Sequence, residues 1–162
     1  MRRDEFVARF GGVYEKSPWV AQETFDDDVD PADAELLAEL FAESVDNASH
    51  ERRLSLIRAH PDLAGRAAIA GKLTEASTEE QSSAGIDRCT PEEFTRFQDL
   101  NNRYKMKFGF PFVMAVRGSN RKDILDAFEE RLKNDPAAEF ERAISEIHKI
   151  ARLRLETMKQ HD

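Results

Sequence analysis

Apolar residues recur three or four positions apart along most of this chain, with charged residues between them. That spacing places the apolar side chains on one face of an α-helix. Proline, glycine and short acidic runs interrupt the pattern and divide it into separate helices. The predicted helices cover residues 18–25, 31–45, 50–60, 63–73, 78–84, 91–107, 121–132 and 136 to nearly the end.

Residues able to cap a helix N-terminus precede most of these segments. A serine, threonine, asparagine or aspartate there accepts a hydrogen bond from a backbone N–H of the first turn. Ser77 and Glu80 also have the spacing of a capping box. The predicted caps are Ser17, Asp30, Ser49, Ser77, Thr90, either Ser119 or Asn120, and Asp135.

Residues 108–116, FGFPFVMAV, depart from this pattern. They are apolar, contain Gly109 and Pro111, and show no helical period, so extended backbone is predicted between two helices. Backbone N–H and C=O groups in such a segment need partners, and the sequence offers no neighbouring strand. Two interpretations remain open. The groups face a ligand, or the segment is a buried loop with side-chain or water partners.

The chain is therefore predicted to be all-α, a single compact multi-helix domain over residues 1–162 with one extended apolar FGFPF segment. Its 162 residues are enough for one sizeable core, and no repeat or linker divides them. No apolar run is long enough to cross a bilayer, and the N-terminus has no signal core. The single Cys89 excludes an internal disulfide and fits a reducing compartment, so a cytoplasmic location is expected.

The net charge of −8 makes the chain a poor general nucleic-acid binder, and an anionic ligand would need a local arginine. Arg154 meets that condition. On the last predicted helix it lies on one apolar stripe, whereas Arg142 and Arg152 point elsewhere; the stripe contains Phe140, Ile144, Ile147, Ala151 and Met158. A core-facing arginine needs an acceptor partner, which is either a protein carboxylate or a ligand bound by both arms of the guanidinium.

His60 in AHPDLAG (59–65) is the leading candidate for chemistry. Pro61 excludes the α conformation at the preceding residue, so a helix should end near His60. The negative end of the helix dipole favours a protonated imidazole, which suits a proton donor near neutral pH. The alternative is a histidine that only satisfies the last carbonyls of the helix.

Other candidates carry weaker signals. Residues 77–81 could line a polar pocket at a helix N-terminus, although a capping Ser77 and Glu80 need no further role. His60, Asp62 and His148 resemble a two-histidine, one-carboxylate metal site only loosely, and Asp26, Asp28 and Asp30 fail the calcium-loop pattern. No metal is therefore predicted. Cys89 precedes a helix cap that could lower its pKa, but no base is near it in sequence. Asn101 is predicted to be a hydrogen-bonded structural residue.

Taken together, these segments resemble the OHCU decarboxylases, the 2-oxo-4-hydroxy-4-carboxy-5-ureidoimidazoline decarboxylases of urate breakdown. The segments that carry the resemblance are VYEKSPWVA (13–21), HPDLAG (60–65), EQSSAG (80–85), LNNRYKMKFGFPFVMAV (100–116) and KIARLRL (149–155). They cover nearly the whole chain in the same order. HPDLAG and FGFPF together are specific to this family, whereas either motif alone would be a signal of only moderate specificity.

The resemblance implies an all-α enzyme without a cofactor that converts OHCU to (S)-allantoin and carbon dioxide. It implies His60 as the proton donor, Glu80 as its catalytic partner and Arg154 as a substrate ligand. The other implied substrate contacts are Pro61, Ser77, Thr78, Glu79, Gln81, Phe112, Val113, Met114, Ala115 and Val116. It also implies a homodimer. The C-terminal KQHD lacks a peroxisomal signal, so a bacterial-type cytoplasmic enzyme is expected.

Two other classes of function stay open. A helical enzyme of this fold could act on another ureido or imidazoline substrate, and a non-catalytic interaction module could keep the fold. Neither a membrane nor a nucleic acid is expected as a partner. The presence of every implied site residue argues against both the enzyme with another substrate and the non-catalytic module.

Overall fold

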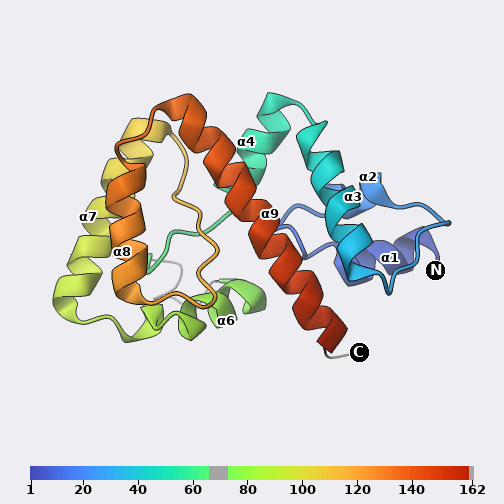
Figure 1. Cartoon of the computed structure of the whole chain (residues 1–162), viewed down its shortest axis with the longest axis horizontal. Helices are drawn as coiled ribbons and strands as arrows, with labels where there is room; N and C mark the ends of the chain where they lie inside the picture. Colours follow the sequence, from blue (N-terminus) through green and yellow to red (C-terminus); the bar gives the residue numbers. More distant parts are fainter. Residues whose placement is uncertain (66–72, 161–162) are drawn as a thin grey trace. The chain divides into compact units, whose positions relative to one another are not determined.

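The computed structural model describes residues 1–65 and 73–160. Within them every regular element is a helix, which confirms the all-α prediction (Figure 1). The helices are α1 (Arg3–Phe10), α2 (Trp19–Thr24), α3 (Ala34–Asp46), α4 (His50–Arg58), α6 (Glu75–Ser83), the short 3-10 helix η1 (Ile86–Arg88), α7 (Pro91–Phe108), α8 (Arg121–Arg131) and α9 (Pro136–Gln160). No helix of these residues is both long enough and apolar enough to span a membrane.

The chain forms two compact units. The first contains Met1–His60 and the C-terminal residues from Ile147, and the second contains Pro61–Glu146. Each has its own aromatic core. In the first, the rings of Phe6, Phe10 and Phe41 pack with centroids 4.9–6.1 Å apart. In the second, Phe112 stacks on Phe128 at 3.7 Å, with Tyr104 edge-on to both.

Several predicted helix starts are confirmed by their hydrogen bonds. Ser49 accepts from the N–H of Arg52, and Thr90 forms a complete capping box with Glu93. Asn120 rather than Ser119 caps α8, and the Asp135 carboxylate accepts from the N–H of Ala138 at the start of α9. In each case the cap and its partner are three residues apart, so the signal is entirely local.

Three predicted starts are wrong. Asp33 caps α3, while Asp30 accepts from the N–H of Ala32 in a preceding turn. Thr74 rather than Ser77 caps α6, which places Ser77 inside the helix. Ser17 does not cap α2, because its hydroxyl donates to the carbonyl of Glu15.

Two other differences concern the extent of the helices. Helix α1 was not predicted from the sequence. The predicted helix 63–73 lies largely outside the described residues, and its first part, Leu63 and Ala64, forms a turn.

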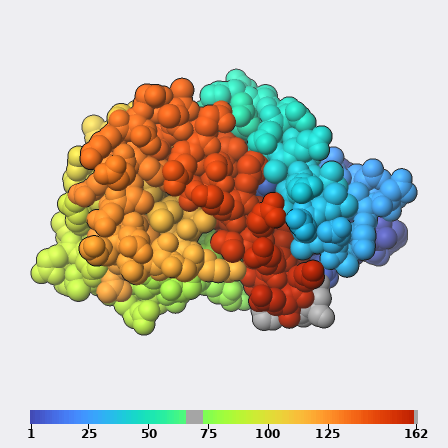
Figure 2. All heavy atoms as spheres, viewed as in Figure 1, coloured from blue at the N-terminus to red at the C-terminus, as the bar shows by residue number. Residues whose placement is uncertain are grey.

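The segment that follows α7 is non-helical, as predicted. Residues 111–116 belong to neither helix nor strand, and a turn at Arg117 and Gly118 leads to α8. Figure 1 shows this stretch running past α8, and Figure 2 shows its light orange atoms reaching the surface beside that helix. Phe112, Val113 and Val116 are buried, whereas Met114 and Ala115 are partly exposed.

Candidate active site

His60 lies just beyond the end of α4, where the sequence placed it. Its backbone N–H donates to the carbonyl of Ile57, and its Nδ1 lies 2.9 Å from the carbonyl oxygen of Leu56. A carbonyl can only accept a hydrogen bond, so Nδ1 carries a proton. In the part of the chain that the structure describes, Nε2 has no hydrogen-bond partner. A neutral His60 therefore presents Nε2 as a proton acceptor.

The electrostatics of His60 differ from the sequence expectation. The side chain is 8% exposed, and burial lowers the pKa of His60 from 6.5 to about 4. The Leu56 carbonyl and the Glu15 carboxylate oppose this pKa shift, and Arg154 adds to it, but burial is the largest effect. The carbonyls at the helix end thus favour the imidazolium, as predicted, but desolvation of the buried side chain lowers the pKa by more than they raise it. Without substrate, His60 is neutral at pH 7.

Arg154 is buried, as its helical stripe predicted, and its partner is a protein carboxylate. Its Nη2 lies 2.7 Å from Oε2 of Glu15, with side chains 7% and 1% exposed. Its Nη1 donates to the carbonyl of Gly12 at 3.3 Å. Of the two interpretations left open, the ion pair within the protein is therefore present. The first unit brings His60, Arg154 and Glu15 into one electrostatic cluster.

Sequence reasoning did not single out Glu15. It lies between α1 and α2 within VYEKSPWVA, one of the segments that carry the family resemblance, and it is 139 positions from Arg154. A carboxylate that is 1% exposed indicates a buried cationic partner, but burial is not visible in the sequence.

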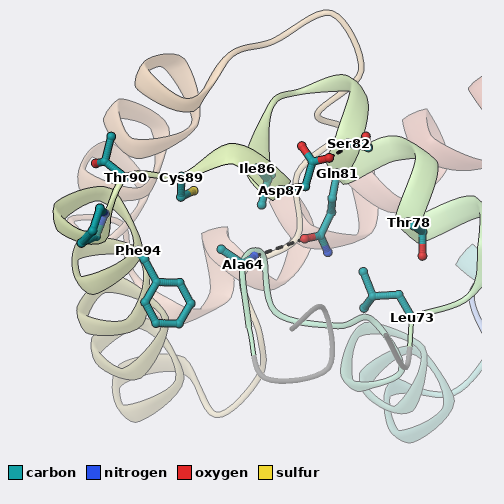
Figure 3. Close-up of a pocket in the computed structure, with 11 residues that line it drawn as sticks. Ala64, Leu73, Thr78, Gln81, Ser82, Ile86, Asp87, Cys89, Thr90 and Phe94 are labelled. Atoms are coloured by element: carbon teal, nitrogen blue, oxygen red, sulfur yellow. Dashed lines mark hydrogen bonds between the residues drawn. The ribbon is translucent and has the colours of Figure 1, made fainter. Parts of the chain in front are cut away.

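Gln81 holds the turn that follows His60 in the chain. Its Oε1 accepts from the N–H of Ala64 at 3.2 Å, and its Nε2 donates to the carbonyl of Asp62 at 3.3 Å. Figure 3 shows the side chain reaching across to Ala64. Both ends of the amide are thus engaged within the protein, which indicates a structural role for a residue that the resemblance implied as a substrate contact.

Side chains of α7 hold the same turn. Gln98 donates to the carbonyl of Ala64 at 2.7 Å, and Asn101 donates to that of Leu63 at 2.9 Å. The ammonium of Lys105 lies 2.6 Å from the Asp62 carboxylate. Asn101 is therefore the hydrogen-bonded structural residue that the sequence predicted, although its buried Oδ1 lacks a partner among the described residues.

The predicted polar cluster 77–81 lies on α6 of the second unit. Ser77 is buried and its N–H is bound by Thr74, so it is no longer an open donor at a helix N-terminus. Thr78 is exposed, and its hydroxyl donates to the Thr74 carbonyl at 2.9 Å. Glu79 is exposed, and Glu80 is half-buried. Pro61, in the turn before them, is also half-buried.

A cavity of about 510 Å³ opens beside α6 (Figure 3). The residues that line it are Ala64, Leu73, Thr78, Gln81, Ser82, Ile86, Asp87, Cys89, Thr90, Pro91 and Phe94. Two predicted substrate contacts, Thr78 and Gln81, therefore share its wall with mainly apolar neighbours. Burial raises the pKa of the Cys89 thiol, so the helix cap beside it does not activate it.

The residues of the loosely suggested metal site have other partners. Nδ1 of His148 lies 2.8 Å from the Tyr14 hydroxyl, and Nε2 lies 3.0 Å from Oδ1 of Asp46. Among the described residues, no three histidine, cysteine or acidic side chains gather in a way that could hold a metal ion. Of the sequence-predicted candidates, then, His60 and Arg154 share one cluster, and the α6 residues and 112–116 lie in the second unit.

Comparison with known proteins identifies the family of this chain. The family model described as OHCU decarboxylase matches residues 1–156. The chain belongs to the OHCU decarboxylase family. A 2-oxo-4-hydroxy-4-carboxy-5-ureidoimidazoline decarboxylase of Halalkalicoccus jeotgali is 42% identical over 156 residues, which are 96% of this chain and 86% of that protein. One from Haloferax volcanii is 42% identical over 152 residues, covering 94% and 88%.

Solved structures agree on the fold. A crystal structure of (S)-allantoin synthase has a TM-score of 0.76 and 30% identity, with 97% of this chain matching 50% of that one. A crystal structure of OHCU decarboxylase in the presence of (S)-allantoin has a TM-score of 0.73 over 91% of this chain and 95% of that one. At 24% identity, the second comparison bears on the fold alone.

Proposed function

We propose that this protein is a carboxy-lyase that converts OHCU to (S)-allantoin and carbon dioxide in urate degradation. The observation that carries the proposal is the family match over residues 1–156. The buried His60, with Nδ1 engaged and Nε2 left as an acceptor, supplies a group suited to this chemistry.

The substrate carries its own electron sink. The carboxylate of OHCU is on a ring carbon that also bears a hydroxyl and lies next to a ring C=N. When the bond to the carboxylate breaks, its electron pair moves into the imine, the ring nitrogen of that imine takes up a proton from solvent, and an enol remains. A proton must leave the hydroxyl, and another must reach the ureido-bearing carbon. The decarboxylation step itself therefore needs acid–base groups more than an added electron acceptor.

We infer that His60 serves both proton transfers. Neutral in the substrate-free protein, it accepts the hydroxyl proton at Nε2 and becomes an imidazolium. It then delivers that proton to one face of the ureido-bearing carbon. The low pKa near 4 makes the imidazolium a strong acid once it has formed, which favours the second step. This ordering keeps His60 as the proton donor, with its proton supplied by the substrate.

The remaining assignments follow the resemblance and stay proposals. Glu80 would bind ring or ureido N–H groups of the substrate. Arg154 would bind a substrate carbonyl or carboxylate beside its ion pair with Glu15. Contacts from Pro61, from 77–81 and from 112–116 would complete substrate binding.

The direct test starts from urate with urate oxidase and hydroxyisourate hydrolase and follows allantoin by circular dichroism, with and without this protein. Rapid formation of one enantiomer is the expected result, and slow racemic product at the uncatalysed rate would refute the proposal. His60→Asn should lower the catalysed rate by about 10²–10⁴-fold. An unchanged rate in that variant would remove His60 from the mechanism.

We also propose that the protein is a cytoplasmic homodimer, in line with the family resemblance and the unpaired Cys89. Sedimentation equilibrium at micromolar concentration tests the assembly state. A mass near 18.5 kDa at every concentration would contradict the dimer, because that is the mass of one chain. Fractionation of the source cells would test the location.

A further inference from the structure

Among residues 1–65 and 73–160 no strand lies beside the non-helical segment 112–116, so the partners of its backbone groups need an explanation. In the part of the chain that the structure describes, two of these groups are bound by charged side chains. The carbonyl of Val113 accepts from Nη1 of Arg131 at 2.6 Å. The N–H of Ala115 donates to Oε1 of Glu146 at 3.1 Å. Side chains of α8 and α9 thus replace a neighbouring strand along this stretch.

Arg131 is held rigidly where it meets the segment. Its Nε and Nη2 donate to the Glu139 carboxylate at 2.9–3.2 Å, and the two side chains are 4% and 0% exposed. Burial by itself would raise the pKa of Glu139, but hydrogen bonds from Arg131, Tyr104 and Asn134 outweigh it and hold that pKa below its usual value. The guanidinium also lies 4.3 Å from the ring centroid of Phe112. Its contact with Val113 therefore comes from a fixed, charged donor.

Glu146 is the second such group. Its side chain is 4% exposed, and its other oxygen accepts from Nε of Arg142 at 3.3 Å. A glutamate this deeply buried is costly unless its oxygens are hydrogen-bonded. The N–H of Ala115 is one of the groups that satisfies it, so the segment and the carboxylate stabilise each other.

The bound groups belong to residues two positions apart. In extended backbone, the N–H and C=O of one residue point to the same side, and those of the next residue point to the other. Val113 and Ala115 therefore turn one backbone edge toward Arg131 and Glu146. By the same alternation, the backbone groups of Phe112 and Met114 are expected to point the opposite way, and Met114 is partly exposed.

We propose that Arg131 and Glu146 are positioning residues that hold one backbone edge of 112–116, so that the opposite edge, centred on Met114, binds the amide groups of the substrate. The inference rests on the proposed function for the identity of the substrate. It also separates the five implied substrate contacts of 112–116 into two groups. The carbonyl of Val113 and the N–H of Ala115 are already bound within the protein, so the contacts to substrate come from the opposite edge.

Three variants of glutamates test this. Glu146→Leu removes the acceptor for Ala115 without leaving a buried charge, whereas Glu146→Gln keeps an acceptor oxygen of nearly the same shape. Glu93→Leu is the matched control, because Glu93 also accepts from one backbone N–H, that of Thr90, and from one arginine, Arg121. Arg131→Lys is a further variant that keeps a charge beside Glu139 but loses the planar fork.

Two readouts are needed. Amide hydrogen exchange followed by NMR, on the protein without substrate, should show the Ala115 N–H exchanging faster in Glu146→Leu and near the wild-type rate in Glu146→Gln. Steady-state kinetics with OHCU should show KM raised roughly tenfold in Glu146→Leu and in Arg131→Lys, with kcat changed less. Glu93→Leu should lose some stability, less than Glu146→Leu because the Glu93 side chain is 27% exposed, and should keep the wild-type KM.

The outcomes separate the two proposals. Equal increases of KM in Glu146→Leu and Glu93→Leu, or a Glu146→Gln variant as impaired as Glu146→Leu, would overturn the positioning role. Unchanged Ala115 exchange in Glu146→Leu would also overturn it, whatever the activity. A wild-type protein without OHCU turnover, but with the expected exchange pattern, would refute the proposed function and leave the hydrogen bonding of the segment established.

Discussion

At the scale of single residues, His60 shows two opposing electrostatic effects on one side chain. The helix end and Glu15 favour the imidazolium, while burial disfavours it and prevails. A similar conflict arises at Arg154, where a buried cation is tolerated because Glu15 neutralises it. Both side chains combine an unfavourable environment with a specific partner, which is typical of functional sites.

The pH dependence of activity should reveal the resting state of His60. The neutral imidazole accepts the first proton in the proposed mechanism. We therefore expect kcat/KM to be constant from pH 6 to 8 and to decrease at lower pH, as the pH approaches about 4. Steady-state kinetics across this range provide the measurement. A kcat/KM that instead falls as pH rises from 5 to 7 would show that the imidazolium is required in the free enzyme.

Acid should also destabilise the protein through His60. Its pKa is about 4 when folded and 6.5 as a reference for the unfolded chain, so unfolding takes up a proton between these values. The stabilisation is fully present above pH 6.5 and is lost as pH falls toward 4. At pH 5 the unfolding free energy should be lower than at pH 7 by about 2 kcal/mol from this group. Urea unfolding at pH 7 and 5 should show that loss in the wild type and a smaller loss in His60→Asn; equal losses would contradict the assigned shift.

The ion pair of Arg154 allows its structural and substrate roles to be separated. Arg154→Met should cost about 3–5 kcal/mol of unfolding free energy, because it removes the buried cationic partner of Glu15. Adding Glu15→Leu should restore most of that stability, since neither charge of this ion pair then remains buried. If Arg154 also binds substrate, the stable double variant stays inactive toward OHCU. Recovery of turnover in that variant would restrict Arg154 to a structural role.

At the scale of secondary structure, two of the three errors in the helix starts share a cause. Asp30 and Asp33 precede α3, and Thr74 and Ser77 precede or begin α6, so each helix had two candidate caps three residues apart. Both members of each pair have suitable side chains, so the residue type at the cap could not distinguish between them. Ser49 and Thr90 each stood alone and were predicted correctly, whereas Ser17, which also stood alone, donates to the carbonyl of Glu15 instead.

The cap of α6 can be tested directly, because the Thr74 hydroxyl accepts from the N–H of Ser77. Thr74→Ala should lower the unfolding free energy by about 1 kcal/mol. Thr74→Ser keeps the hydroxyl and should lose much less. Denaturant midpoints at constant slope provide the measurement, and equal losses in both variants would argue against a capping role.

At the scale of the whole molecule, the predicted single domain remains a prediction, because the chain forms two compact units. Two features favour cooperative unfolding. The chain passes from one unit to the other between His60 and Pro61 without a linker, and α9 contributes residues to both units.

Trp19 offers a test of that cooperativity. It is the single tryptophan and lies in the first unit, so its fluorescence reports on that unit, while far-UV circular dichroism reports helices of both. Coincident urea transitions by the two methods are the expected result. A dichroism phase without a fluorescence counterpart would show that the second unit unfolds separately.

The sequence by itself determined the helical class, most helix boundaries, the stripe that carries Arg154, the histidine after α4 and the family. These depend on residues three or four positions apart or on contiguous motifs, so they can be recognised in one dimension. Only the tertiary structure decided the rest. Glu15 lies 139 positions from Arg154, Glu146 lies 31 from Ala115, and burial controls the pKa of His60. Contacts between residues far apart in sequence, and the burial of side chains away from water, form only when distant segments pack together.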